Sequence, residues 1–183
     1  MPGIRVIGEA GEYQTLVDTL GYYLSHPPIA DPRFASQPDT TITHWVVNGD
    51  VGLGPSPGLP VGYIAPLNDT IVPYGKGGST GGPSGSDMDE FTVPILIIQG
   101  EHKVEPPVES TAIENPGYLE QPGGRALMEL VQSVRKALRV EGTFGGAVAT
   151  STITEIRPML INLDDKLFRG ARLTLTARQR RPR

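Results

Sequence analysis

The chain has 183 residues, a formal net charge of −4 and no cysteine. This length is enough for one domain with a substantial core, and the acidic balance gives no general case for nucleic-acid binding. The lack of cysteine excludes a disulfide framework and a thiolate metal site. The N-terminus has no basic segment before an apolar run, and no apolar stretch is long enough for a bilayer. We therefore expect a soluble intracellular protein.

The first predicted element is a helix that begins near Glu12. Gly21 weakens this helix by about 1 kcal/mol relative to alanine, and the segment His26-Pro27-Pro28 ends it. Its apolar residues recur at helical spacing, which predicts one buried face; they are Tyr13, Leu16, Val17, Leu20 and Leu24.

Short strands and long loops follow the first helix. We expect a strand over residues 42–47, a turn at Asn48–Asp50, and short strands at Val61–Ile64 and Thr70–Val72. Apart from Met88, residues 75–89 are Gly, Ser, Thr, Lys, Pro and Asp with almost nothing to bury, so we expect a flexible loop there.

An apolar run of residues then begins abruptly at Phe91 and continues to Ile98. A run this short and this apolar is typical of a strand that is buried on both faces. We therefore place it in the centre of the sheet, beneath a helix.

The strongest helical signal lies at Arg125–Arg139, after the punctuating residues Pro122, Gly123 and Gly124. Lys136 and Arg139 stand in the last turn, where cations complement the helix dipole, and Gly142 is placed to end the helix in a left-handed conformation. The apolar residues lie on one face of a 3.6-residue period; they are Leu127, Leu130, Val131, Val134 and Leu138.

The end of the chain predicts a pair of strands. Residues 145–157 are rich in Thr, Val and Ile, which favours a strand, and Pro158 indicates a bulge or an edge. Asn162 and Asp164-Asp165 predict a turn, after which apolar and polar residues alternate over 171–178. This alternation predicts an antiparallel strand with one wet face.

This order of elements predicts an α+β fold, in which two main helices pack on one side of a mostly antiparallel sheet with long Gly/Pro-rich loops. We expect one domain over residues 1–183, with a flexible loop at about 75–89 and a basic C-terminal tail at 178–183.

The sequence shows no pattern of catalytic residues. The segment Tyr74–Thr80 resembles a phosphate-binding loop, but Lys76 is followed by glycine, Thr70 stands where the first glycine belongs, and no strong helix follows. His26, His44 and His102 have no partner at metal-binding spacing, and no serine stands in a Gly-x-Ser-x-Gly elbow. We therefore expect no enzyme activity, no cofactor and no metal site.

Charged residues form two groups that are candidates for an interface. The acids Asp87, Asp89 and Glu90 flank the predicted loop; like Asp164-Asp165, they lack the spacing of a calcium loop and are better interpreted as solvated turn acids. The terminal arginines form either a solvated tail or an arm that reaches an acidic partner surface or phosphates. The candidate interface residues are Lys76, Asp87, Asp89, Glu90, Arg178, Arg180, Arg181 and Arg183.

The order of the predicted elements resembles the tail terminator (tail completion) family of long-tailed bacteriophages. The local similarity lies in the last third of the chain: the helix ends in Val140-Glu141-Gly142, a Thr-rich strand follows, and residues 168–176 read Phe-Arg-Gly-Ala-Arg-Leu-Thr-Leu-Thr. The last strand of such proteins often has this Arg-Gly-Ala-Arg-Leu-Thr-Leu pattern. Residues 51–89 are longer and richer in Gly and Pro than the family pattern.

The resemblance implies a structural virion protein, assembled in the host cytoplasm. Its subunits would form a homo-hexameric ring that caps the phage tail tube and joins it to the head-tail connector or stopper protein. Viral DNA would pass through the ring without specific binding, which agrees with an acidic chain. A loop and charged tails that order on contact, and strand edges that pair between subunits, agree with ring assembly. No membrane partner is expected.

Two alternatives remain open. A tail-tube protein, or another neck or connector protein, would share the small α+β build and the ring. A small hydrolase would instead place an unrecognised site in the Gly/Pro-rich middle of the chain.

Overall fold

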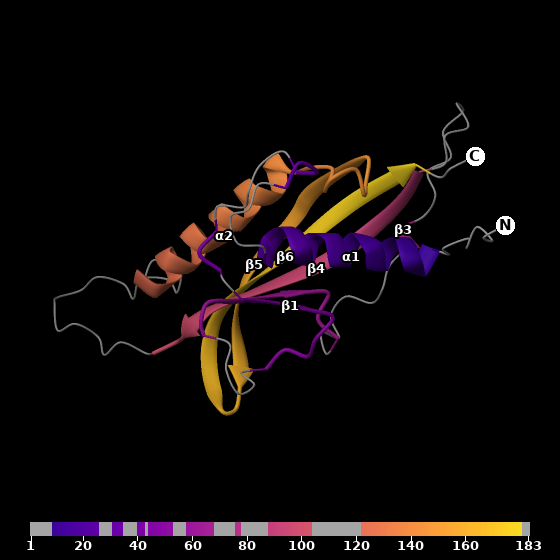
Figure 1. The fold of residues 1–183 in the computed structure, drawn as a ribbon. Coiled ribbons are helices and arrows are strands. Elements are labelled where there is room, and N and C mark those ends of the chain that lie inside the picture. Colours follow the sequence, from indigo (N-terminus) through magenta and orange to yellow (C-terminus); the bar gives the residue numbers. More distant parts are fainter. Residues whose placement is uncertain are drawn as a thin grey trace.

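The chain folds into two helices and a twisted sheet (Figure 1), as a computed structural model shows for residues 9–25, 31–34, 40–42, 44–52, 58–67, 76–77, 88–103 and 122–180. The elements in chain order are α1 (Glu9–Ser25), β1 (His44–Val47), β2 (Val61–Ile64), β3 (Lys76–Gly77), β4 (Met88–Glu101), α2 (Pro122–Val140), β5 (Thr150–Leu163) and β6 (Lys166–Arg180).

The sheet has the strand order β1-β2-β4-β6-β5, and the short β3 pairs with the first residues of β4. β1 and β2 run parallel, whereas the remaining pairs are antiparallel. The predicted α+β class with a mostly antiparallel sheet is thus confirmed. The apolar run at Phe91–Ile98 lies in β4, the middle strand of the path, as the sequence predicts.

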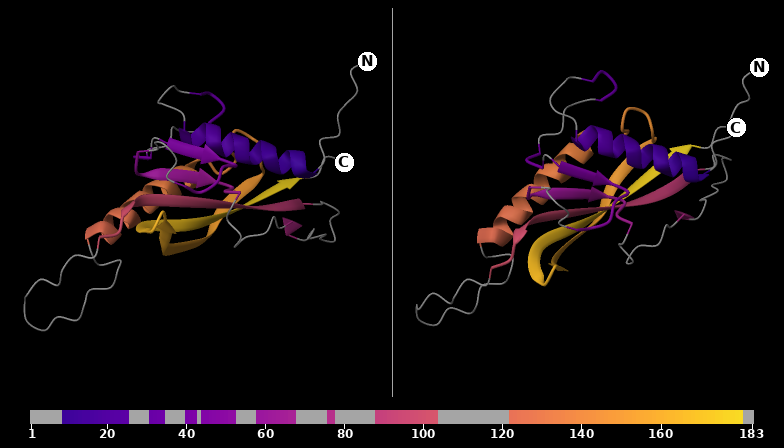
Figure 2. Two further views of the ribbon diagram at one scale, coloured as in Figure 1. Left: turned by 90° about the horizontal axis from the view of Figure 1, so that it is seen from below. Right: turned by 60° about the horizontal axis from the view of Figure 1, so that its bottom comes forward.

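Both helices pack on the same face of the sheet, as Figure 2 shows. Leu130 and Val134 of α2 are buried in this layer, and so are Leu16 and Leu20 of α1. The hydroxyl of Tyr23 donates a hydrogen bond of 3.3 Å to the carbonyl of Ala137, which joins the two helices directly. The helical faces that the spacing predicts are therefore the faces that form the core.

The opposite face of the sheet is apolar over only part of its area. Tyr63, Leu96 and Ile98 form a second buried cluster with Phe168, against which the far half of β5 packs. Beside it Arg172 is only 5% exposed. The expectation of a wet face along residues 171–178 is therefore wrong for Arg172, because it stands opposite Leu96, a member of this buried cluster.

The β5–β6 hairpin turns at Asp164 and Asp165, both of which have positive φ values (50° and 60°). Two consecutive left-handed residues are typical of the tight turn whose twist matches antiparallel strands, so the predicted turn is confirmed. The register of β5 shifts between Ile153 and Glu155. Pro158 lies in the edge strand, where its missing N–H is tolerated.

The start and the end of α2 differ from expectation. The helix begins at Pro122 and so includes Gly123 and Gly124, since Pro is favoured in the first turn. Gly142 is not among the residues with positive φ; the left-handed residues come later, at Phe144–Gly146. The reason is that the side chain of Phe144 is buried in the core, so the chain makes further turns to place it there.

The ranges predicted for a flexible loop and a tail overlap strands of the sheet. β3 and the first residues of β4 fall inside 75–89, and residues 78–87 lie outside the described part of the chain. β6 continues to Arg180, because its last residues pair with Met88–Glu90 of β4. The expectation that a tail begins at residue 178 is therefore corrected. The predicted strand at Thr70–Val72 and residues 104–121 also lie outside the described residues.

Candidate assembly interface

The charged residues singled out from the sequence converge at one end of the sheet. β4 begins there and β6 ends there, so that Glu90 stands opposite Arg178 and Met88 stands opposite Arg180. On the other side of β4, Gly77 of β3 also stands opposite Glu90. Residues that are about ninety positions apart in the sequence thus become neighbours through antiparallel pairing.

Glu90 and Arg178 form an ion pair at this end of the sheet. Nε of Arg178 donates a hydrogen bond of 2.9 Å to Oε2 of Glu90. The side chains are 32% and 58% exposed, so the pair lies in the range of about 0.2–1 kcal/mol that is typical of surface ion pairs. On the other face of the same strands Phe91 packs near Tyr13 of α1, with 6.4 Å between ring centroids. The pair therefore lies on the sheet face away from the helices.

The other predicted interface residues are placed only in part. Lys76 lies in β3 opposite Phe91, Asp89 lies in β4 opposite Gln179, and Arg180 lies in β6. Asp87, Arg181 and Arg183 lie outside the described residues. Within the described part of the chain, the structure thus brings the acidic and basic groups together instead of presenting them as two separate surfaces.

Threonines extend this polar end across the sheet face. Thr92, Thr176 and Thr152 stand in one row over β4, β6 and β5. The hydroxyl of Thr154 lies 3.2 Å from the carbonyl oxygen of Thr174 and 3.2 Å from the hydroxyl of Thr176. Hydroxyl side chains can donate and accept hydrogen bonds, so this face is able to bind another polar surface. The alternation in β6 predicted the polar character but not the partners on β5.

β5 and β1 form the two edges of the sheet path. β5 has 14 residues and, in the described part of the chain, pairs only with β6. Within the described residues no second strand pairs with β5, so as an edge strand it is a candidate template for pairing with another chain. The sequence predicted a strand here, but the order of strands that makes it an edge is set by distant pairing.

A basic groove lies on the outer side of α2. It is an open pocket of about 370 Å³, and its described lining consists of Gln132, Arg135, Lys136, Arg139 and Val140. This described lining contains three cations and no acidic residue, so the groove is suited to an acidic partner. The sequence indicated only the polar face of a helix here.

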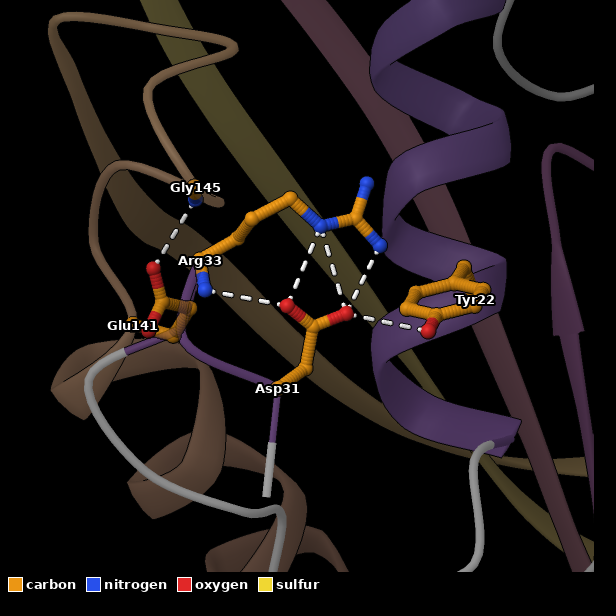
Figure 3. Close-up of polar contacts among 5 residues, drawn as sticks. All are labelled: Tyr22, Asp31, Arg33, Glu141 and Gly145. Carbon is orange, nitrogen blue, oxygen red and sulfur yellow. Dashed lines mark hydrogen bonds and ion pairs between the residues drawn. The ribbon is translucent and has the colours of Figure 1, made fainter. Parts of the chain in front are cut away.

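A further polar cluster that the sequence did not reveal holds residues 31–34 against α1 (Figure 3). The carboxylate of Asp31 accepts hydrogen bonds from Nη2 of Arg33 (2.7 Å), from the Arg33 backbone N–H (2.9 Å) and from the Tyr22 hydroxyl (3.0 Å). The Arg33 guanidinium lies 4.9 Å from the centre of the Tyr22 ring. Hydrogen bonds from the Arg33 side chain and backbone hold the pKa of Asp31 well below its usual range, and Asp31 raises the pKa of Arg33.

This cluster also lies against the turns that follow α2. In Figure 3 the Glu141 carboxylate accepts a hydrogen bond of 3.0 Å from the N–H of Gly145. A side chain at Gly145 would approach the Cβ and carbonyl oxygen of Arg33 at 3.3 Å. These hydrogen bonds join residues of the cluster to one another. We therefore interpret the cluster as a structural clamp between α1 and the end of α2.

Among the described residues, no cluster of three or more His, Cys, Asp or Glu side chains has a metal-binding arrangement. In the same part of the chain, neither helix combines the length and the apolar character that crossing a membrane requires. Comparison of the sequence with protein-family models and with curated proteins finds no match.

Proposed function

We propose that this chain is a structural virion protein, the subunit of a hexameric ring that caps a phage tail tube and joins it to the head-side connector. The class comes from the resemblance of the last third of the chain to tail terminators. The observation that carries the proposal is that β5, 14 residues long, is an edge strand of the sheet path, at the opposite side from the edge strand β1.

Two different edge strands on one subunit favour a head-to-tail contact. Such a contact uses different surfaces on the two neighbours, and it closes into a ring when the rotation between subunits allows it. Pairing at an edge supplies main-chain hydrogen bonds, and the side chains on each face add specificity. Repetition around a ring would also turn weak contacts into a stable assembly.

The surface chemistry supports a ring through which DNA passes. The net charge is −4, so the subunit as a whole has no attraction for a polyanion. The row of threonines beside the Glu90–Arg178 pair is polar and nearly neutral. A face of this kind would line a passage or meet a neighbouring ring without holding DNA in place.

The test is the mass and shape of the purified protein. A terminator subunit should give a species of six times 19.6 kDa, either alone or after mixing with tail tubes, and rings in electron micrographs. Rings that stack into long tubes would favour the alternative of a tail-tube protein. A monomer that neither assembles nor sediments with tubes would contradict the proposal.

Matched variants test the role of the β5 edge. Thr152→Lys adds a charge to the edge strand, and charges are a common natural device against edge pairing; we expect it to abolish the ring. Thr15→Lys makes the same change at an exposed position of α1 and should leave the ring intact. Equal assembly of the two variants would exclude β5 as the contact between subunits. Whether the protein forms a ring at all is decided separately by the mass measurement.

A further inference from the structure

Arg169 of β6 is buried without a carboxylate partner in the described part of the chain. The residue is 8% exposed, and its one hydrogen bond there runs from Nη1 to the carbonyl oxygen of Glu101, 3.2 Å away. Its Nε is buried and has no hydrogen-bond partner. A buried guanidinium is normally paired with a carboxylate or phosphate, because an uncompensated charge in the interior is costly.

The guanidinium lies against the first turn of α2. A Cβ built on Gly123 would overlap Nη1, Cζ and Nε of Arg169, so the guanidinium lies directly against the backbone of Gly123. Figure 1 shows the start of α2 beside the end of β4, where Glu101 lies. The absence of a side chain at Gly123 is what allows this approach.

The start of α2 is itself a site of positive potential. The first amides of a helix have no intrahelical acceptor, and Pro122 has no N–H group to donate. Within the described residues, no backbone carbonyl outside the helix accepts a hydrogen bond from the amides of Gly123, Gly124 and Arg125. The first turn contains no acidic residue. A helix of 19 residues thus directs its positive end toward a buried cation.

We propose that the start of α2 and Arg169 form a binding site for an oxyanion, a phosphate or a carboxylate group. The site has two independent sources of positive charge that repel each other when it is empty. An anion that accepts hydrogen bonds from both would offset this repulsion and tie α2 to β6. This site does not depend on ring formation.

The free part of Arg169 matches such a ligand in geometry. Nη1 donates to the carbonyl oxygen of Glu101, while Nε has no hydrogen-bond partner. The edge of a guanidinium that carries Nε and one terminal nitrogen binds carboxylate and phosphate oxygens as a fork. The amides of the first turn supply further donors, as they do where helices bind phosphate.

The experiment is a titration of the full chain, followed by amide NMR shifts, with sodium phosphate, sodium acetate and sodium chloride at one ionic strength. We expect saturable shifts at the amides of Gly123, Gly124 and Arg125 with phosphate or acetate but not with chloride. A stronger response to phosphate assigns a phosphate group, and a stronger response to acetate assigns a carboxylate from a protein. Equal responses to all three salts, or none at these amides, would overturn the proposal.

Variants then test the part played by the guanidinium. Arg169→Gln should weaken binding by roughly ten- to a hundred-fold, as expected for the loss of charge-assisted hydrogen bonds. Arg169→Lys should recover only part of it, since a lysine lacks the fork. Arg157→Gln removes a charge from β5, where the side chain is 63% exposed, and should not change the affinity. If Arg169→Gln fails to fold, the wild-type titration with its chloride control still decides.

Discussion

Oε2 of Glu90 on β4 lies 2.9 Å from Nε of Arg178 on β6, so that two residues predicted as separate interface charges neutralise each other. Their strands are antiparallel and in register at this point. An arm made of the terminal arginines therefore has one positive charge fewer to offer an acidic partner, because Arg178 is already paired with Glu90.

Glu90→Gln should have a small effect on folding and a larger one on assembly. The loss of stability should be below about 1 kcal/mol, because both side chains are partly exposed, and it should shrink further in high salt. If Arg178 docks on an acidic neighbour, the variant should bind tail tubes more tightly, since the arginine is released. Co-sedimentation over a salt series measures this, and unchanged binding at low salt would remove Arg178 from the interface.

Truncation separates the strand from the residues beyond it. Removing residues 181–183 should leave the melting temperature unchanged, because β6 ends at Arg180. Removing residues 178–183 also deletes the strand positions that pair with Met88–Glu90. This should cost about 0.5–1.5 kcal/mol for each hydrogen bond lost. Thermal unfolding of the two truncated chains distinguishes them, and equal melting temperatures would mean that the end of β6 adds nothing to stability.

Leu130→Ala should destabilise the protein far more than Arg135→Ala. Leu130 is 7% exposed and lies in the core between α2 and the sheet, so truncation should cost about 2–5 kcal/mol. Arg135 lines the outer groove of α2, and its loss should cost less than about 0.5 kcal/mol. Urea unfolding gives both values. Similar costs would mean that the helix is turned differently on the sheet.

Sequence periodicity predicted those elements whose signal is local. The apolar faces of α1 and α2, the buried run at Phe91–Ile98 and the Asp164-Asp165 turn each occupy a short window of the chain, where spacing or turn chemistry decides the structure. The sequence indicated only that Gly123 interrupts the chain before the helix. The side chain that packs against it belongs to Arg169, which lies 46 positions away on β6 (169 − 123). Contacts at such separation leave no periodic trace.

The candidate site was predicted by charge but not by geometry. Glu90 and Arg178 were both singled out, yet their pairing depends on the register of two strands. Asp31 and Arg33 were not singled out at all, although an acid two residues before an arginine is a local signal. Their anchoring role required Tyr22 of α1, which only the fold brings to them.

Gly21→Ala should destabilise the protein, although alanine favours a helix. In an isolated helix the change would stabilise by about 1 kcal/mol. In this fold the new Cβ would overlap Cγ2 of Val47 on β1, and overpacking of this kind typically costs about 1–3 kcal/mol. Gly100→Ala, where no atom lies within 4 Å of the new Cβ, is the control. A rise in the melting temperature of Gly21→Ala would show that α1 and β1 separate easily.

The clamp at Asp31 should persist at a pH where ordinary aspartates have lost their charge. Hydrogen bonds from Arg33, first from its side chain and then from its backbone, lower the pKa of Asp31 below its ordinary value of 3.8. Because the folded pKa is depressed, the contribution to stability is fully present well above the ordinary pKa of 3.8, and it is lost as the pH falls from there through the folded pKa. The carboxyl carbon shift of Asp31 should therefore show no inflection between pH 3 and 5. In the wild type the signals of Tyr22, whose hydroxyl binds Asp31, should change when Asp31 takes up a proton, and in Asp31→Asn this change should be lost. A titration midpoint of Asp31 near its ordinary value of 3.8 in the wild type would contradict the clamp.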